Sequence, residues 1–213
     1  VNPDGVARVS RYNANNVDLN RNYGYEWSPL EFRSGDRAFS EPETRNIRAL
    51  SHWVPFGAGI SVHSGATNLG WVWNYTTTPS PDAEIVEDIA EAYEEECDQM
   101  GFYITNGADW YVTHGDTTDW AYGRHGTLDY TLEVSNQKNP GAGSMSNVVE
   151  THTPRLIDFI QWPWMTRGHV IDSLSERGVP AVIQTQGSGW PLQAGPQGHF
   201  SRPTSGTTSS LTV

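Results

Sequence analysis

The segment between Asp82 and Met100 most constrains how this chain can fold, because it is strongly amphipathic. Its apolar residues recur at steps of three and four, the period of a helix with one buried face, and carboxylates fill the opposite face. The apolar positions are Val86, Ile89, Tyr93, Cys97 and Met100. Such a helix has to cover an apolar layer, so the rest of the chain must supply one. We expect the acidic face to be exposed to solvent and assign it no function.

Two short segments have the pattern of strands that can form this layer. Residues 59–62 are an apolar, β-branched run bounded by glycine, which predicts a buried strand whose end presents His63 and Ser64. Residues 128–134 alternate between apolar and polar side chains, which predicts a strand with one apolar face and with Glu133 on the other face.

Two further helices are expected around these strands. Ser40 as N-cap, with Pro42 in the first turn and Glu43 three residues after the cap, forms a capping box ahead of a helix. The apolar positions of that helix are Ile47, Leu50 and Val54. Another helix is expected from about Asn147 to Ile160. Helices that alternate with strands predict an α/β layer.

The two ends of the chain differ from this central part. The sequence NPDG at residues 2–5 favours a turn, followed by a loop as far as Asp36. From Gly168 onward, Gly, Pro and Ser separate short β-branched pieces (HVID, VPAVIQTQ, HFSRP and SSLTV), which predicts a second, all-β module. The chain starts at Val1 without an initiating Met and stops within the last of these pieces, so we expect it to belong to a longer protein.

Charge and composition exclude some classes of partner. Asp and Glu outnumber Lys and Arg by 25 to 13, giving a formal net charge of -12, so nucleic acid and anionic membrane surfaces would be repelled. No apolar run is long enough for a membrane span. The single cysteine, Cys97, cannot form an internal disulfide, and its place in an amphipathic helix favours a buried apolar residue over a reactive thiol.

Taken one at a time, the candidate site residues allow two interpretations. His63 at the end of a strand is suited to bind a metal, but a structural or surface histidine is the more common case. Glu133 is either a reactive carboxylate or an ordinary residue on a solvated strand face. The group of Arg11, Asn20 and Arg21 is either part of a site or a polar loop.

Six motifs in a fixed order resemble those of the zinc carboxypeptidases of the animal pancreatic and bacterial secreted type. They are NPDG, RYNANNVDLNRNY, SEPET, SVHSG, DTTDWAYGRHG and TLEVS, and the resemblance covers residues 1 to about 163. The run YVTHGDTTDWAYGRH is most similar to the bacterial carboxypeptidase T-like enzymes. The resemblance implies an α/β fold with a mixed central sheet flanked by helices, of which residues 1–165 would be the C-terminal part.

A weaker resemblance covers the tail. Residues 166–213 resemble the start of a transthyretin-like or carboxypeptidase-regulatory-like β-sandwich, and the segment GHVIDSLSERGVPAVI carries this resemblance. The alternative is a generic bacterial β-sandwich that is appended for folding or attachment.

The resemblance to the zinc carboxypeptidases implies a role for each candidate residue. His63 matches the third zinc ligand, whereas the other two ligands, a His and a Glu three residues later, would precede the NPDG motif and are not in this sequence. Glu133 matches the carboxylate that takes a proton from zinc-bound water and passes it to the leaving amine. Arg11 matches the arginine that polarises the scissile carbonyl and then faces the oxyanion.

Other matched residues would bind the substrate. Asn20, Arg21 and Tyr111 match groups that hold its terminal carboxylate, which a guanidinium and an amide side by side can do with charge-assisted hydrogen bonds. Asp116 matches a pocket aspartate that would admit terminal Lys or Arg besides hydrophobic residues; the alternative is that it caps a turn. The remaining residues assigned to the substrate site are Ser64, Thr118 and Thr131.

The expected function is that of a secreted, zinc-dependent exopeptidase that removes one residue, hydrophobic or basic, from the C-terminus of peptides or proteins. Two alternatives stay open: a related zinc amidohydrolase that acts on acylated amino acids or cell-wall peptides, and a non-catalytic module that binds peptide C-termini. Glu133 and Arg11 argue against the binding module, because a binder has little need of a base or an oxyanion group. Secretion is implied by the family alone.

Overall fold

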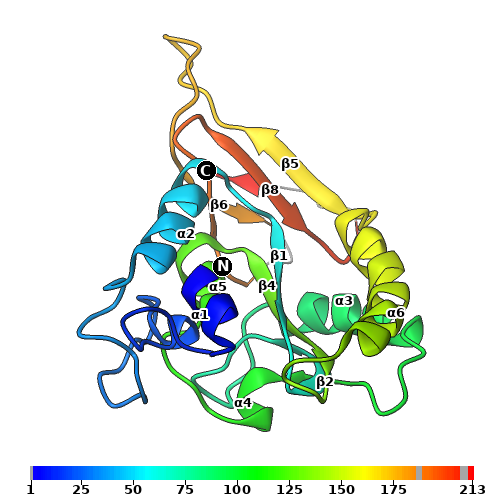
Figure 1. Ribbon diagram of the computed structural model, residues 1–213. Helices are drawn as coiled ribbons and strands as arrows, with labels where there is room; N and C mark the ends of the chain where they lie inside the picture. Colours follow the sequence, from blue (N-terminus) through cyan, green and yellow to red (C-terminus); the bar gives the residue numbers. More distant parts are fainter. Residues whose placement is uncertain (1, 186–188, 207–210) are drawn as a thin grey trace.

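A four-stranded mixed sheet forms the centre of the fold, in the order β1-β4-β2-β3 (Figure 1). The computed structural model describes residues 2–185, 189–206 and 211–213. β1 runs parallel to β4, whereas β2 runs antiparallel to β4 and parallel to β3. The strands are β1 (Ala58–His63), β2 (Ala66–Trp71), β3 (Tyr103–Asn106) and β4 (Leu128–Ser135).

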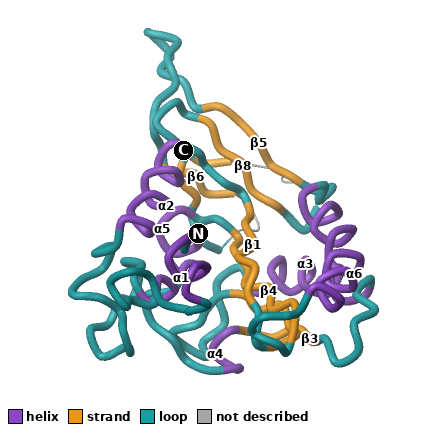
Figure 2. The backbone as a smooth tube through the Cα atoms, viewed as in Figure 1, coloured by secondary structure: helices purple, strands orange, loops and turns teal. Residues whose placement is uncertain are grey.

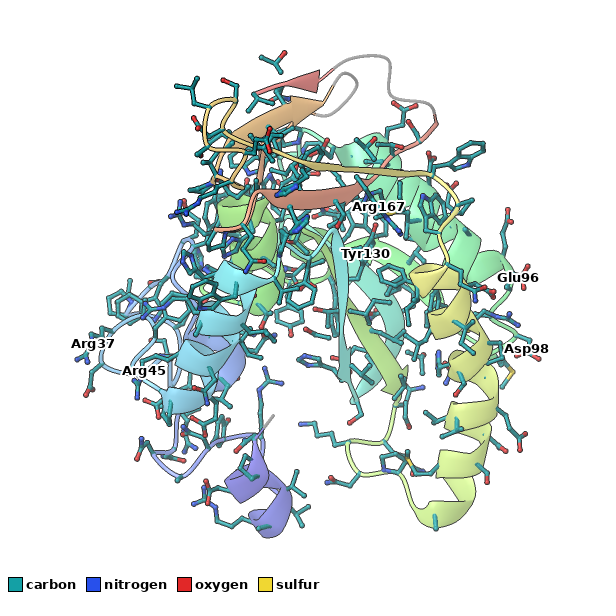
Figure 3. All side chains as sticks on the ribbon, turned by 90° about the horizontal axis from the view of Figure 1, so that it is seen from above. Arg37, Arg45, Glu96, Asp98, Tyr130 and Arg167 are labelled. Carbon is teal, nitrogen blue, oxygen red and sulfur yellow. The ribbon has the colours of Figure 1, made fainter. Side chains whose placement is uncertain are left out.

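Helices cover both sides of this sheet. Figures 1 and 3 show α2 (Pro42–Trp53) and α5 (Thr117–His125) on one side, and α3 (Ala83–Glu95) and α6 (Ala142–Ile160) on the other. The long N-terminal loop region, teal in Figure 2, lies on the same side as α2. The predicted fold class, a mixed central sheet flanked by helices, is therefore confirmed. None of the helices in the described ranges has the length and apolar character needed to cross a membrane.

The main hydrophobic core lies between the central sheet and α3. Leu128, Tyr130 and Leu132 project from one face of β4 and are fully buried in this core, and the Tyr130 hydroxyl donates to the Val86 carbonyl of α3 at 3.1 Å. The buried residues of α3 are Ile85, Val86, Ile89, Ala90 and Tyr93. The amphipathic pattern therefore predicted the buried side of this helix correctly.

The end of α3 differs from the prediction. The helix stops at Glu95, so Cys97 lies just beyond it and packs half-buried against the core. Met100 is 95% exposed, and its predicted place on the apolar side of the helix is wrong. The reason is that Met100 belongs to the turn toward β3, in which Gly101 takes a left-handed φ of 79°.

The N-terminal NPDG motif forms a short helix instead of the predicted turn. This helix, α1, spans Pro3–Arg8, and the Asn2 side chain accepts a hydrogen bond of 2.9 Å from the Gly5 amide. Pro at the first helical position and Asn at the cap favour a helix start as well as a turn, and here the helix forms. Further along the predicted loop, a 3-10 turn, η1 (Leu19–Arg21), is capped by Asp18.

Helix α2 begins without the predicted capping box. Glu41 occupies the N-cap position, and no side chain caps the first helical amides. The hydroxyl of Ser40 instead donates to the Glu41 carboxylate at 2.7 Å and accepts from Asn22 Nδ2 at 2.9 Å, so the preceding loop uses it. Of the predicted apolar positions, Ile47 packs against a small buried cluster, whereas Leu50 and Val54 stay exposed.

The strands also correct two expectations. β1 is an edge strand among the described strands and is half-buried rather than buried, with Val62 59% exposed. β4 has the predicted apolar face, but its other face, which carries Asp129 and Glu133, is buried too. α6 ends at Ile160 as predicted and begins five residues before the predicted start. The pattern did not predict β2, β3, α4 (Gly107–Trp110) or α5.

The C-terminal residues form two small antiparallel sheets at the top of Figure 1. β5 (Met165–His169) pairs with β8 (His199–Pro203). β6 (Val182–Thr185) pairs with β7 (Leu192–Gln193) and β9 (Leu211–Thr212). The pieces VPAVIQTQ and SSLTV extend to residues 186 and 209–210, which lie outside the described residues. The division into residues 1–165 and 166–213 stays a prediction.

A buried ion pair joins these small sheets to the α/β part. Arg202 of β8 donates to the carboxylate of Asp82, which directly precedes α3. The same carboxylate accepts hydrogen bonds from the Tyr122 hydroxyl and from the backbone amides of Gly189 (2.8 Å) and Trp190 (3.2 Å). These hydrogen bonds offset the free-energy cost of burying the two charges, whereas removing one partner would leave an uncompensated charge and destabilise the fold strongly. We call this group of contacts the Asp82 node.

We expect Arg202→Met to lower the free energy of unfolding by about 3–5 kcal/mol, because it leaves the Asp82 carboxylate buried without its counter-ion. The matched control is Arg167→Met in the neighbouring strand β5, where the arginine is exposed and the expected change is below about 0.5 kcal/mol. Urea denaturation measures both values. A loss in Arg202→Met no larger than in the control would contradict the role given to the ion pair.

Candidate active site

One pocket gathers most of the predicted site residues. It lies where the N-terminal loop, the central sheet and the segment from α4 to α5 meet. Eight of the predicted residues line it: Arg11, Asn20, Arg21, His63, Tyr111, Asp116, Thr131 and Glu133. We call this cavity the Glu133 pocket.

Strand pairing explains why three of the lining residues lie together. Glu133 on β4 is directly opposite His63 on β1 and Asn68 on β2. Residues that are opposite each other on neighbouring strands project from the same face of a sheet. His63, Glu133 and Asn68 therefore form one row across the floor of the Glu133 pocket.

Glu133 is held in an environment that suits a proton acceptor. Its side chain is 7% exposed, and among the described residues its Oε2 atom has no hydrogen-bond partner. Burial raises the pKa of Glu133, and the positive charge of Arg11 partly opposes this shift. A buried carboxylate with a raised pKa and an unsatisfied oxygen is a candidate general base.

His63 is held in its neutral form. Burial and the positive charge of Arg11 lower the pKa of His63 to about 4. Neutral imidazole is the form that binds zinc, so the side chain itself fits a metal ligand. Within the described ranges, however, no three His, Cys, Asp or Glu side chains are grouped closely enough to hold a metal ion. The described residues therefore do not form a complete zinc site by themselves, and the role of His63 as one zinc ligand stays a prediction.

Arg11 is fixed by an ion pair within the N-terminal loop. Its Nε atom donates to Asp18 at 2.6 Å, and the other Asp18 oxygen accepts from the Asn20 amide at 3.1 Å. The loop is braced further by Asn13, whose side chain accepts from the amides of Asn15 and Val17. The asparagine-rich segment is therefore a scaffold that presents Arg11 to the Glu133 pocket.

Asn20 and Arg21 are positioned by the loop and by α5. The Asn20 Oδ1 atom accepts from the amide and the hydroxyl of Thr117, each at 3.0 Å. Arg21 donates to the Asn20 carbonyl at 2.6 Å and lies 3.6 Å from a Glu31 oxygen. Tyr111, the third predicted carboxylate-binding residue, also lines the pocket and is largely exposed. The three side chains thus border one cavity.

Asp116 has the structural role that the sequence left as an alternative. Its carboxylate caps α5 by accepting from the Asp119 amide at 2.8 Å. It also accepts from the Thr113 hydroxyl at 2.8 Å and from Asn74 Nδ2 at 3.2 Å. Burial raises its pKa. Asp116 both caps a helix and lines the Glu133 pocket, and its role in specificity stays a prediction.

Two predicted residues lie outside the pocket lining. The Ser64 hydroxyl donates to the Lys138 carbonyl at 2.8 Å. Thr118 is buried behind Thr131, and their hydroxyls lie 3.0 Å apart. Thr118 therefore supports a lining residue, whereas Ser64 braces the loop after β4.

The model of the zinc carboxypeptidase family matches residues 1–155, which is most of the chain. The chain belongs to the zinc carboxypeptidase family. The assignment agrees with the resemblance carried by the six sequence motifs. Placement in the T-like subgroup stays a prediction.

Curated relatives extend the match into the tail. The chain is 28% identical over 208 residues to carboxypeptidase SOL1 of Arabidopsis thaliana, covering 91% of this chain and 42% of that protein. It is 28% identical over 201 residues to carboxypeptidase D of Mus musculus, covering 83% and 14%. Because residues 1–155 are a smaller share of the chain, both matches reach past residue 155. This zinc carboxypeptidase chain spans less than half of either relative.

Solved structures support the fold. Carboxypeptidase A from Helicoverpa armigera superposes with a TM-score of 0.66 at 21% identity, covering 75% of this chain and 49% of that chain. Thrombin-activatable fibrinolysis inhibitor superposes with a TM-score of 0.54 at 21% identity, covering 68% and 40%. At 21% identity these structural comparisons support only the fold of this zinc carboxypeptidase chain.

Sequence reasoning missed several lining residues of this zinc carboxypeptidase chain. Asn68 is 0% exposed, its Nδ2 donates to the Tyr103 hydroxyl at 2.9 Å, and no partner for its Oδ1 is found in the described part of the chain. An asparagine inside an otherwise apolar strand is uncommon and was the available signal. The other lining residues that were missed are Gly70, Asn74, Gly107, Trp110 and Thr113.

A second buried carboxylate lies on the polar face of β4. Asp129 is buried, and no described residue binds its Oδ2 atom. Gly59, directly opposite on β1, leaves room for it, since a Cβ there would lie 2.3 Å from Asp129 Oδ1. Burial, with the negative charge of Asp116 adding to it, raises the pKa of Asp129 to about 7.

We expect Asp129→Asn to become more stable relative to the unchanged protein as the pH rises from about 4 to 7. The usual pKa of 3.8 is raised to about 7 in the folded state, so over this window the folded state binds more protons and loses stability with rising pH. The variant lacks this loss, so the difference should grow by up to about 1.4 kcal/mol per pH unit.

Denaturation at several pH values measures this difference, and Asp98→Asn, at an exposed position, is the control (Figure 3). A difference for Asp129→Asn that does not change with pH would show that the carboxyl titrates normally in the folded protein.

Proposed function

We propose that the protein containing this chain is a zinc-dependent carboxypeptidase that removes single residues from peptide C-termini. The observation that carries the proposal is the Glu133 pocket, in which a buried carboxylate with an unpaired oxygen adjoins a neutral histidine and two arginines. Membership of the family supports the peptidase class. Because the chain spans only part of its curated relatives, two zinc ligands besides His63 would come from residues outside this sequence.

Substrate binding would rest on Asn20, Arg21 and Tyr111. The amide and hydroxyl of Thr117 both donate to the Oδ1 atom of Asn20. The NH2 group of the Asn20 side chain therefore remains available to donate to a ligand. Arg21 offers a guanidinium, which matches the two oxygens of a carboxylate. A free C-terminus bound here would displace the loose contact of 3.6 Å between Arg21 and Glu31.

The chemistry would be carried by Glu133 and Arg11. Bound zinc would polarise the scissile carbonyl and make water acidic enough to attack. Oε2 of Glu133 accepts a proton from the attacking water and delivers it to the leaving amine nitrogen as the peptide C–N bond breaks. Arg11, held by Asp18, stabilises the negative charge that develops on the carbonyl oxygen.

Three finer parts of the proposal follow from the family resemblance. Asp116 would let a mainly hydrophobic pocket also accept terminal Lys or Arg. The protein would be secreted. The C-terminal strands would serve folding or attachment, and the Asp82 node supports a role in folding because it buries an ion pair between the two parts.

A non-catalytic peptide-binding module is the second candidate. The observation that favours it is the lack of a three-ligand metal group within the described residues. It predicts binding of free C-termini without turnover, so the same assay separates the two candidates.

We expect Glu133→Gln to reduce turnover by at least about 100-fold with little change in KM, because the amide cannot accept the proton. The assay is release of terminal Phe from a blocked dipeptide by the full-length protein, with and without a zinc chelator. Zinc content should be unchanged in the variant, and Glu87→Gln on the exposed side of α3 is the control. Retained turnover in Glu133→Gln would refute its role as base, and no release by the unchanged, zinc-loaded protein would favour the binding module.

We expect Asp116→Asn to lower kcat/KM for terminal Arg at least about tenfold more than for terminal Phe, because it removes a charge from the pocket. Both substrates are compared in the same preparation, so loss of the helix cap cancels in the ratio. Equal losses for the two substrates would mean that Asp116 acts only as a cap.

A further inference from the structure

A second cavity lies between α2 and α5, away from the Glu133 pocket. Its volume is about 580 Å³, within the size range of small-molecule sites, and it shares no lining residue with the Glu133 pocket. Arg45 and Arg48 of α2 face Arg124 of α5 across it. We call this cavity the arginine pocket.

The charge of the arginine pocket is opposite to that of the chain. Three arginines (Arg45, Arg48 and Arg124) and two histidines (His52 and His125) line it, and no Asp or Glu does. The chain as a whole has a formal net charge of -12. In the described ranges none of the three guanidinium groups forms an ion pair with a carboxylate. Arg45 interacts with the carboxylate of Glu41, but Glu41 does not line the pocket, so the pocket itself keeps an excess of positive charge.

Helix dipoles explain only some of these cations. Arg124 lies in the last turn of α5, where the dipole favours positive charge. Its neighbour His125 is neutral near pH 7, because burial and the charge of Arg124 lower its pKa to about 4. Arg45 and Arg48 lie in the first half and the middle of α2, where the dipole gives no such preference. Arg45 donates to the carbonyls of Phe39 (3.2 Å) and Ser40, so it also holds the loop that precedes α2. Arg48 contacts the Phe39 ring but has no hydrogen-bond partner among the described residues, and an anionic ligand would supply one.

Aromatic rings form the remaining walls. The Cζ atom of Arg48 lies over the Phe39 ring, 4.6 Å from its centre. Trp53 lines the pocket and is 64% exposed, and Trp120 lies behind with its ring 5.1 Å from that of His125. Guanidinium groups beside exposed aromatic rings suit a ligand that has both anionic groups and a flat apolar body.

We propose that the arginine pocket is a binding site for a small organic polyanion: a flat aromatic or heteroaromatic body that carries at least two sulfate, phosphate or carboxylate groups. A ligand with two anionic groups can pair with guanidinium groups of α2 and α5 at the same time. The volume of this open cavity fits a small molecule, and the net negative charge of the chain disfavours an extended polyanion such as nucleic acid. The site does not depend on the proposed peptidase activity.

The test is isothermal titration of the full-length protein with naphthalene-1,5-disulfonate, which has two anionic groups on a flat body. We expect saturable binding with one site per chain, weakened by added salt. Inorganic pyrophosphate, which has the charge without the aromatic body, should bind at least tenfold more weakly. Equal affinity for pyrophosphate would overturn the inference that the aromatic walls take part.

Variants locate the binding. Arg48→Gln and Arg124→Gln should each weaken binding at least tenfold, whereas Arg167→Gln in β5, a residue that does not line the pocket and is labelled apart from Arg45 in Figure 3, should leave it unchanged. Thermal melting checks that each variant is folded, and if Arg124→Gln is not, Arg48→Gln decides the question. The proposal is overturned if the unchanged protein shows no saturable binding, or if folded Arg48→Gln binds as tightly as Arg167→Gln.

Discussion

The structure depends on the burial of β4 on both of its faces. One face buries Leu128, Tyr130 and Leu132 in the main hydrophobic core, and the other places Glu133 in the floor of its pocket. Because successive side chains of a strand point to opposite faces, a slip of one residue would exchange the two sets and bury Glu133 in the apolar core. Burial of the apolar face of β4 therefore fixes the position of Glu133 relative to its neighbours on β1 and β2, and the geometry of the site follows from the hydrophobic core.

Elements with a clear apolar period could be predicted from the sequence. Apolar residues recur at steps of three and four in α3 and at every second position in β4, and the structure places these apolar sides in the core. β2 escaped prediction because its buried residues do not alternate and because Asn68 and Gly70 interrupt the apolar run. α5 escaped although Asp116 and Gly126 mark its start and end, since that segment was interpreted as a binding motif rather than as a helix.

The site was predictable to the extent that motifs carry it. The resemblance to a known family identified eight residues that line one pocket although they are distant in the sequence. Asn68 and Asn74 belong to none of the six motifs and enter the pocket through strand pairing and loop packing. The one local signal was the presence of Asn68 in a largely apolar stretch. Ser64 and Thr118 were assigned to the substrate site but do not line the pocket. Ser64 follows His63 in the sequence but donates to the Lys138 carbonyl, and the Thr118 hydroxyl lies against that of Thr131 behind the pocket wall.

The Asp82 node has a consequence for how this protein could have evolved. The family match ends at residue 155, yet three of the four described residues that donate to the Asp82 carboxylate lie beyond it, at Gly189, Trp190 and Arg202. A border drawn where the family match ends would therefore separate Asp82 from most of these partners. Recombination that exchanged the C-terminal strands for those of a relative would succeed only if the incoming segment supplied a matching arginine, or if Asp82 were replaced in the same step.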